Sequence, residues 1–130
     1  LVALDLENDG TTAEERKIML QAVKQSSQFD ALALAEQLQR VDAVQVIQFL
    51  QQWCCDLTTC MLASKVRYYP EQIEIIGKIT KNISLLDLLR YQKELHVAKR
   101  EAFHPLNPKL LFESLFLNYR QLLLSGNRPN

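Results

Sequence analysis

The C-terminal region has the clearest division between apolar and polar positions. Between Asn107 and Ser125, apolar residues recur at helical spacing over one broad arc, which predicts a helix with a fully buried face. This arc consists of Leu111, Phe112, Leu115, Phe116, Tyr119, Leu122 and Leu123. Asn107 is a favourable N-cap, Pro108 suits the first helical position, and Gly126 is expected to end the helix at the C′ position.

A second, narrower apolar stripe on the same predicted helix contains Leu110, Leu117 and Leu124. A charged arc borders it on one side, and a small-polar arc of Ser114, Asn118, Gln121 and Ser125 borders it on the other. We expect both arcs to stay near solvent. An edge helix of a small domain needs only one apolar face, so the second stripe predicts a contact with a partner. The alternative is that it packs beneath the N-terminal arm of its own chain. The interface candidates are Leu110, Glu113, Leu117, Arg120 and Leu124.

Five further segments carry helical periodicity and capping signals. The pattern predicts helices over residues 11–25, 29–39, 42–64, 70–83 and 84–103. Thr11 and Thr12 form overlapping capping boxes, and Ser26-Ser27 breaks the chain after the first of these helices. We find no strand alternation or internal repeat. The expected fold is an all-α, single-domain bundle of about five to six helices with short loops over residues 1–130, with residues 1–10 as a flexible arm.

The predicted 42–64 and 84–103 helices are both amphipathic. Trp53 lies in the middle of the apolar face of the first, and we expect it in the core. The opposite, solvent-facing side is expected to contain Gln45, Gln48, Gln51, Gln52, Asp56 and Thr59. The buried residues expected in the second helix are Leu85, Leu88, Leu89, Tyr91, Leu95, Ala98 and Ala102.

The charge balance argues against a dedicated nucleic-acid binder. The chain has 15 Lys and Arg and 15 Asp and Glu, so its formal charge is zero, whereas such binders depend on neutralising phosphates. A modest basic cluster (Lys65, Arg67, Lys78 and Lys81) is interpreted as solvated surface, with phosphate contact as the alternative. No apolar run reaches the roughly 18–20 residues of a membrane span. The chain begins with Leu1, so we expect it to be part of a longer protein.

Residues that carry chemistry are not arranged as a recognisable site. The sequence has no phosphate-binding loop, nucleophile elbow or paired-histidine metal motif. Cys54, Cys55 and Cys60 point to different sides of a helix and cannot converge on one zinc ion, so we expect free thiols in a reducing cytoplasm. His96 and His104 provide no ligand spacing. The sequence therefore predicts no catalytic residue, cofactor or metal ion.

Two segments resemble a known family. The stretch from Asn107 to Leu115 is similar to the N-P-x-L-L-x-E-x-L-L signature near the C-terminus of bacterial clamp-loader subunits, and Ala31–Leu38 with the following Trp-bearing helix resembles the same domain. The matching motif residues are Asn107, Pro108, Leu110, Leu111, Glu113 and Leu115. The resemblance covers about residues 26–124 and is greatest to the delta-prime subunits of DNA polymerase III. Phe112 and Phe116 stand where that family more often has Leu.

This resemblance implies a helical collar domain that carries no catalysis. In that family, collars of five subunits form a ring that holds the loader together while it loads the sliding clamp in DNA replication. The implied partners are the tau/gamma and delta collar domains, with DNA reached only through the complex and with no membrane or small-molecule substrate. The alternatives are the collar of a delta or tau/gamma subunit, or a helical nucleic-acid-binding domain that uses Lys65, Arg67, Lys78 and Lys81.

Overall fold

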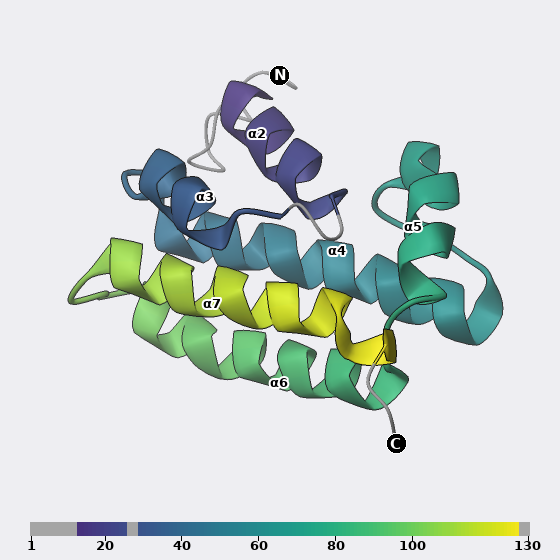
Figure 1. Cartoon of the computed structure of the whole chain (residues 1–130). Coiled ribbons are helices and arrows are strands. Elements are labelled where there is room, and N and C mark those ends of the chain that lie inside the picture. Colours follow the sequence, from purple (N-terminus) through teal and green to yellow (C-terminus); the bar gives the residue numbers. More distant parts are fainter. Residues whose placement is uncertain (1–12, 26–28, 128–130) are drawn as a thin grey trace.

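The computed structural model describes residues 13–25 and 29–127, which form six α-helices and no strand. The helices, labelled as in Figure 1, are α2 (Ala13–Val23), α3 (Ala31–Leu38), α4 (Ala43–Ala63), α5 (Ile73–Thr80), α6 (Leu85–Ala102) and α7 (Pro108–Leu123). This confirms the predicted all-α bundle. The expected arm over residues 1–10, the capping boxes of Thr11 and Thr12, and the break at Ser26-Ser27 lie outside the described residues.

Three long helices make up the body of the bundle. In Figure 1, α4, α6 and α7 lie alongside one another, with α6 antiparallel to the other two. The helix α3 packs on α7, α4 packs on α6, and α5 stands across the end of α4. Trp53 is fully buried at the centre, which confirms its predicted place in the core. Other large, fully buried side chains are Tyr119, Phe112, Phe116, Ile47, Leu50, Leu57, Leu88 and Leu95.

Side-chain caps fix where the long helices begin. Asp42 Oδ1 accepts a hydrogen bond from the Val44 N–H at 2.9 Å, and Asn107 Oδ1 accepts one from the Leu110 N–H at 3.1 Å. Ser84 caps α6 in the same way. Each cap satisfies a backbone donor that has no partner within the first turn of its helix. The predicted starts of α4, α6 and α7 are therefore confirmed.

Gly126 has a different role from the one predicted. The helix α7 ends at Leu123 with Leu124 as its C-cap, so Gly126 lies beyond the C′ position. Its N–H donates a hydrogen bond to the carbonyl oxygen of Asn82 at 3.1 Å. A Cβ atom at position 126 would lie 2.3 Å from that oxygen. Glycine is required here because two backbone segments approach closely, not because a helix needs a left-handed cap.

The apolar face of α6 is narrower than predicted. Leu89, expected among its buried residues, is 46% exposed, whereas Leu88, Tyr91 and Leu95 are buried as expected. Leu89 lies on the arc of α6 that faces away from both α4 and α7. The sequence prediction was wrong here because periodicity alone does not say how wide an arc the neighbouring helices cover.

Candidate protein–protein interface

The broad apolar arc of α7 is the part that faces the core. Six of its seven residues are buried and Leu111 is half-buried, which confirms the prediction for this arc. The buried residues are Phe112, Leu115, Phe116, Tyr119, Leu122 and Leu123. Phe29, which precedes α3, meets the rings of Phe116 and Tyr119 edge to face, with centroids 6.3 and 5.3 Å apart. These contacts fix the rotation of α7 about its own axis.

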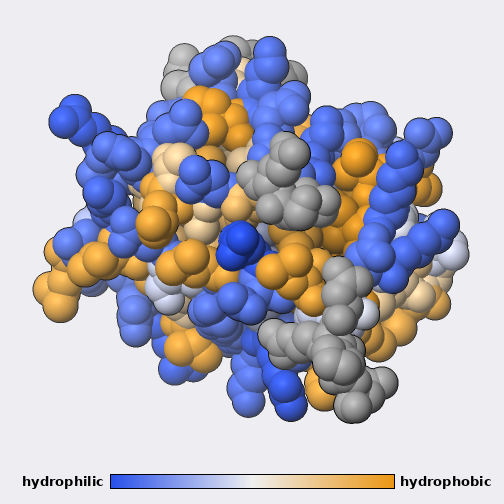
Figure 2. Space-filling view, in the orientation of Figure 1, coloured by the Kyte–Doolittle hydropathy of each residue, from blue (hydrophilic) through white to orange (hydrophobic). Residues whose placement is uncertain are grey.

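The second stripe of α7 is left exposed by this packing. Leu110, Leu117 and Leu124 are 60%, 44% and 36% exposed. Arg120, beside them, is exposed and Glu113 is half-buried. Figure 2 shows hydrophobic atoms broken by hydrophilic ones across this face of the bundle. The interface candidates thus lie on one side of one helix, at its surface.

The six motif residues have three different positions in α7. Asn107 is the N-cap and Pro108 is the first helical residue. Leu115 is buried, and Leu111 and Glu113 are half-buried. Leu110 is exposed and belongs to the stripe. Most of the motif therefore has a structural explanation, and Leu110 is the residue that folding alone does not explain.

A groove adjoins the N-terminal end of the stripe. It lies at the turn between α6 and α7 and has a volume of about 610 Å³. Its apolar lining comes from Leu106, Leu110 and Leu111, and its polar lining includes Glu101, His104 and Ser114. Leu106 is fully exposed at its edge. The outward face of α7 thus combines a line of leucines with a hollow large enough for a partner side chain.

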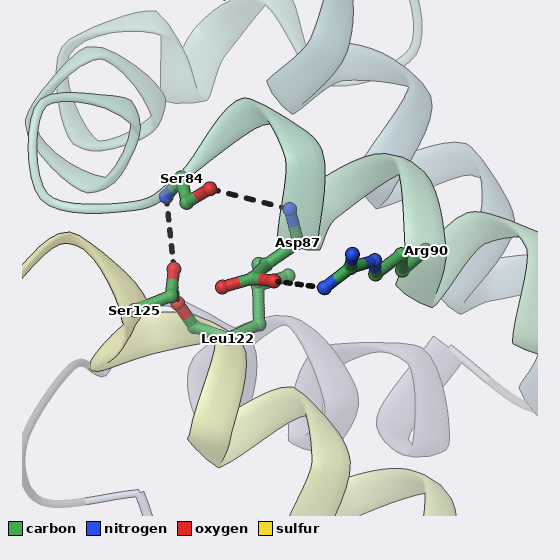
Figure 3. A network of polar contacts seen from close by, with 5 residues as sticks. All are labelled: Ser84, Asp87, Arg90, Leu122 and Ser125. Carbon is green, nitrogen blue, oxygen red and sulfur yellow. Dashed lines mark hydrogen bonds and ion pairs between the residues drawn. The ribbon is translucent and has the colours of Figure 1, made fainter. Parts of the chain in front are cut away.

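A polar seam separates the α7 stripe from the outer face of α6. Glu94 of α6 accepts a hydrogen bond from the Asn118 side chain, and Asp87 pairs with Arg90 at 3.5 Å. Figure 3 shows Asp87 and Arg90 beside the capping residue Ser84. The surfaces on either side of this seam therefore differ in their polar surroundings and in the helix that carries them.

The prediction for the small-polar arc was wrong at Ser125. It was expected near solvent, but it is buried. Its hydroxyl accepts a hydrogen bond from the Ser84 N–H at 2.8 Å and donates one to the Leu122 carbonyl at 2.6 Å, as Figure 3 shows. Ser125 thus joins the end of α7 to the start of α6. Ser114, Asn118 and Gln121 are exposed as predicted.

Two buried tyrosines hold the inner side of α7 in place. The Tyr119 hydroxyl accepts a hydrogen bond from Trp53 Nε1 at 2.9 Å and donates one to the Val23 carbonyl at 2.8 Å, which links α7, α4 and α2. The Tyr91 hydroxyl donates to the Leu115 carbonyl at 2.8 Å. Burial raises the pKa of both tyrosines well above the ordinary value for a phenol. Both hydroxyls therefore stay protonated, as their hydrogen bonds require.

The prediction for Asp56 was also wrong. It was expected on the solvent-facing side of α4, but it is fully buried. Its carboxylate accepts hydrogen bonds from the backbone N–H groups of Arg67, Tyr68 and Tyr69 at 2.8–3.1 Å. The chain after α4 folds back over Asp56, and the charged acceptor organises this loop. No local pattern indicates this role, because the donors lie 11 to 13 residues further along the chain.

The basic cluster lies on this loop and at the C-terminal end of α5. Lys65, Arg67, Lys78 and Lys81 are all exposed, with Glu71 and Glu74 exposed in the same segment. The Arg67 guanidinium lies 5.2 Å from the centroid of the Tyr68 ring. Tyr69 instead packs edge to face against Phe49 and Trp53, with ring centroids 5.7 and 5.8 Å apart. The surface here is mixed in charge.

The residues that could bear chemistry do not come together. Cys54 is buried, whereas Cys55 and Cys60 are half-buried, and all three are free thiols. His96 and His104 are exposed. Within residues 13–25 and 29–127, no group of three or more His, Cys, Asp or Glu side chains is placed to hold a metal ion. In the same part of the chain, no helix has both the length and the apolar character needed to cross a membrane.

Comparisons with known proteins do not assign a family or a function to this chain. A scan against protein-family models gives no match, and searches of curated proteins and of solved structures also return no similar protein.

Proposed function

We propose that the chain is a non-catalytic oligomerisation domain, the collar domain of a clamp-loader subunit of the delta-prime type. Its sequence resemblance to that family centres on α7, from Asn107 to Leu115, and the helical fold is one that a collar requires. The collar of a delta or tau/gamma subunit is the alternative within the same family. In this role the domain helps to hold the loader together during sliding-clamp loading in DNA replication.

The exposed leucine stripe is the observation that carries the proposal. Leu110, Leu117 and Leu124 recur every seven residues, so the line is about 21 Å long at 1.5 Å per residue. The opposite side of the same helix is already used for the core. Exposed apolar side chains that are arranged together on one helix face, rather than scattered singly, support a protein–protein contact. Its length suits packing against a helix of a neighbouring subunit.

Assembly into a ring also requires a particular arrangement of surfaces on each domain. Contacts between unlike subunits in a ring are heterologous, so one domain must present two different surfaces to its two neighbours. The α7 stripe, with the groove at its N-terminal end, is proposed as one of these surfaces. The partners are the tau/gamma and delta collar domains, and DNA is reached only through the assembled complex.

A substitution at the middle of the stripe tests the proposal. Leu117→Asp should change the stability of the isolated chain by no more than about 1 kcal/mol, because the side chain is partly exposed. The same change should strongly weaken co-purification of the full-length subunit with tau/gamma and delta subunits, since it places an unpaired charge in a buried contact. Urea denaturation and native mass spectrometry measure the two effects.

Leu62→Asp is the matched control for this experiment. Leu62 is 66% exposed near the end of α4, away from the stripe, so its substitution should leave both stability and assembly unchanged. If Leu117→Asp unfolds the chain, the stripe is part of the core. If Leu117→Asp assembles as well as the control, the stripe is not the contact and the proposal for this surface is wrong.

A further inference from the structure

The outward face of α6 has an unusual composition. Eight residues occupy the arc that faces away from α4 and α7: four are large and apolar, three are Arg or Lys, and one is His. All eight are exposed. They are Leu86, Leu89, Arg90, Lys93, His96, Val97, Arg100 and Phe103. No carboxylate lies among them.

The acidic residues of α6 lie to the side of this arc. Asp87 pairs with Arg90, and Glu94 accepts a hydrogen bond from Asn118 of α7. Glu101 lines the groove at the turn into α7. Among the described residues, neither Lys93 nor Arg100 has an ion-pair partner. The face is therefore positively charged, although the chain as a whole has a formal charge of zero.

Along one line of this face, apolar and basic side chains alternate from Leu89 onward. The line, which we name the α6 stripe, consists of Leu86, Leu89, Lys93, Val97, Arg100 and Phe103. Its steps of three and four residues keep it on one side of the helix. It extends over 18 residues, or about 26 Å along the helix axis. Such a line matches a partner helix of about five turns.

The alternation favours a protein partner over nucleic acid or lipid. The four large apolar side chains offer nothing to a phosphate backbone, whose recognition depends on positive charge. A helix that inserts into a bilayer surface separates its apolar face from its polar face. Here Lys93 lies between Leu89 and Val97, so insertion would draw its charge into the acyl region. A partner helix can instead place a carboxylate opposite each positive charge and an apolar residue opposite each leucine.

From the charge and apolar pattern of this face we propose that the α6 stripe binds an acidic amphipathic helix of a partner protein. The partner's carboxylates pair with Lys93 and Arg100, and its apolar side chains cover Leu86, Leu89 and Val97. The polar seam of Glu94 and Asn118 separates this surface from the α7 stripe. The inference goes beyond the proposed collar function and does not depend on it.

Binding of synthetic peptides tests the proposal. The probes are fluorescein-labelled 18-residue helical peptides whose Leu and Glu positions follow the spacing of the α6 stripe, and matched peptides with Gln in place of every Glu. The whole chain should bind the best Glu peptide at micromolar concentration and its Gln version at least tenfold more weakly. The difference should shrink as salt is raised, because it arises from ion pairs. Fluorescence anisotropy measures the binding.

A charge exchange locates the site. The double variant Lys93→Glu/Arg100→Glu should lose at least tenfold in affinity for the Glu peptide, and it should instead bind a peptide with Lys at those positions. The matched control, Lys78→Glu/Lys81→Glu, makes the same change in charge at exposed positions at the C-terminal end of α5 and should bind like the parent. Thermal melting of each variant shows that the chain remains folded.

Several outcomes would overturn the proposal. Equal affinity for the Glu and Gln peptides, no binding by any Glu peptide, or an equal loss in the α5 control would each contradict it. Binding to phosphatidylglycerol vesicles or duplex DNA that is abolished by Lys93→Glu/Arg100→Glu, without peptide binding, would assign the face to lipid or nucleic acid.

Discussion

The two sides of α7 use apolar residues in different ways. The inner side combines leucines with Phe112, Phe116 and Tyr119, and its residues lie against α3, α4 and α6. The outer side has leucines alone, each flanked by polar residues and partly open to water. A wide arc that includes aromatic rings therefore marks the side needed for folding. A narrow line of aliphatic residues marks a side that folding leaves available.

This difference means that stability and assembly can be altered separately. Removing a buried side chain leaves a cavity and loses the transfer free energy of the atoms removed. Removing a partly exposed leucine leaves no cavity, because water already surrounds much of it. Neighbouring residues on α7 therefore provide matched pairs of variants, which test whether the inner side is needed for stability and the outer side for assembly.

The sharpest test compares Phe116→Ala with Leu117→Ala. Phe116 is 1% exposed and contacts the rings of Phe29 and Phe112, so its loss should lower the free energy of unfolding by about 3–5 kcal/mol. Leu117→Ala, one residue along, should cost about 1 kcal/mol or less. Urea denaturation of both variants measures this. Similar losses for the two would remove the distinction between the sides.

Alkaline pH should lower the free energy of unfolding, because two tyrosines buried on the inner side of α7 resist ionisation in the folded chain. An unfolded tyrosine has a pKa near 10, and burial raises the pKa of Tyr91 and Tyr119 above it. Above about pH 10 the unfolded chain releases these protons while the folded chain retains them. Their contribution to stability is therefore complete below pH 10 and declines above it, by about 1.4 kcal/mol per pH unit for each tyrosine.

Burial also raises the pKa of Tyr69 to about 12 and raises that of Cys54, so both act in the same direction as the two tyrosines. Denaturant unfolding between pH 8 and pH 11 measures the total decline. The double variant Tyr91→Phe/Tyr119→Phe measures the part of this decline that comes from Tyr91 and Tyr119. Its free energy of unfolding should fall less steeply with pH over the same range. An unchanged slope would show that these two hydroxyls are not protected from ionisation in the folded chain.

The features that the sequence predicted are local in origin. Asn107, Asp42 and Ser84 cap helices through donors only two or three residues away, so their role is visible in a short window. The broad arc of α7 is predicted by its helical period and its width. The exposure of Leu110, Leu117 and Leu124 is also as expected for a stripe outside that arc.

Apart from Leu89, the errors come from contacts between distant segments. Asp56 was placed on a polar face because its neighbours in α4 are polar, yet its donors belong to a loop that only the folded chain brings close. Ser125 and Gly126 both meet the segment at Asn82 and Ser84, more than 40 residues earlier. Helical periodicity contains no information about such pairings. The same holds for the groove beside Leu106, which depends on how α6 and α7 meet.

Loss of one hydroxyl on the inner side should have an intermediate effect. Tyr119→Phe leaves the Trp53 indole N–H without its acceptor and the Val23 carbonyl without this donor, at a cost of about 1–3 kcal/mol. Tyr91→Phe removes one donor from a helix carbonyl and should cost less, about 0.5–1.5 kcal/mol. Urea denaturation followed by the fluorescence of Trp53 measures both. A larger loss for Tyr91→Phe would contradict the central role of the Trp53–Tyr119 pair.

The smallest effect on stability is expected at the charged border of the outer side. Arg120 is exposed, so Arg120→Gln should change the free energy of unfolding by no more than about 0.5 kcal/mol. If the α7 stripe contacts a neighbouring collar, Arg120 lies at the rim of that contact. A rim charge acts mainly on the rate of association and on its dependence on salt, whereas a central apolar residue acts mainly on dissociation.

Surface plasmon resonance with one of the proposed clamp-loader partners separates these two effects. Arg120→Gln should slow or accelerate association by a factor that shrinks as salt is raised, with little change in dissociation. Leu117→Ala should instead speed dissociation and leave the salt dependence of association unchanged, because it removes buried apolar surface and no charge. If Arg120→Gln changes dissociation as much as Leu117→Ala does, Arg120 lies inside the contact. The centre of the interface would then be displaced from the leucine line toward the charged arc of α7.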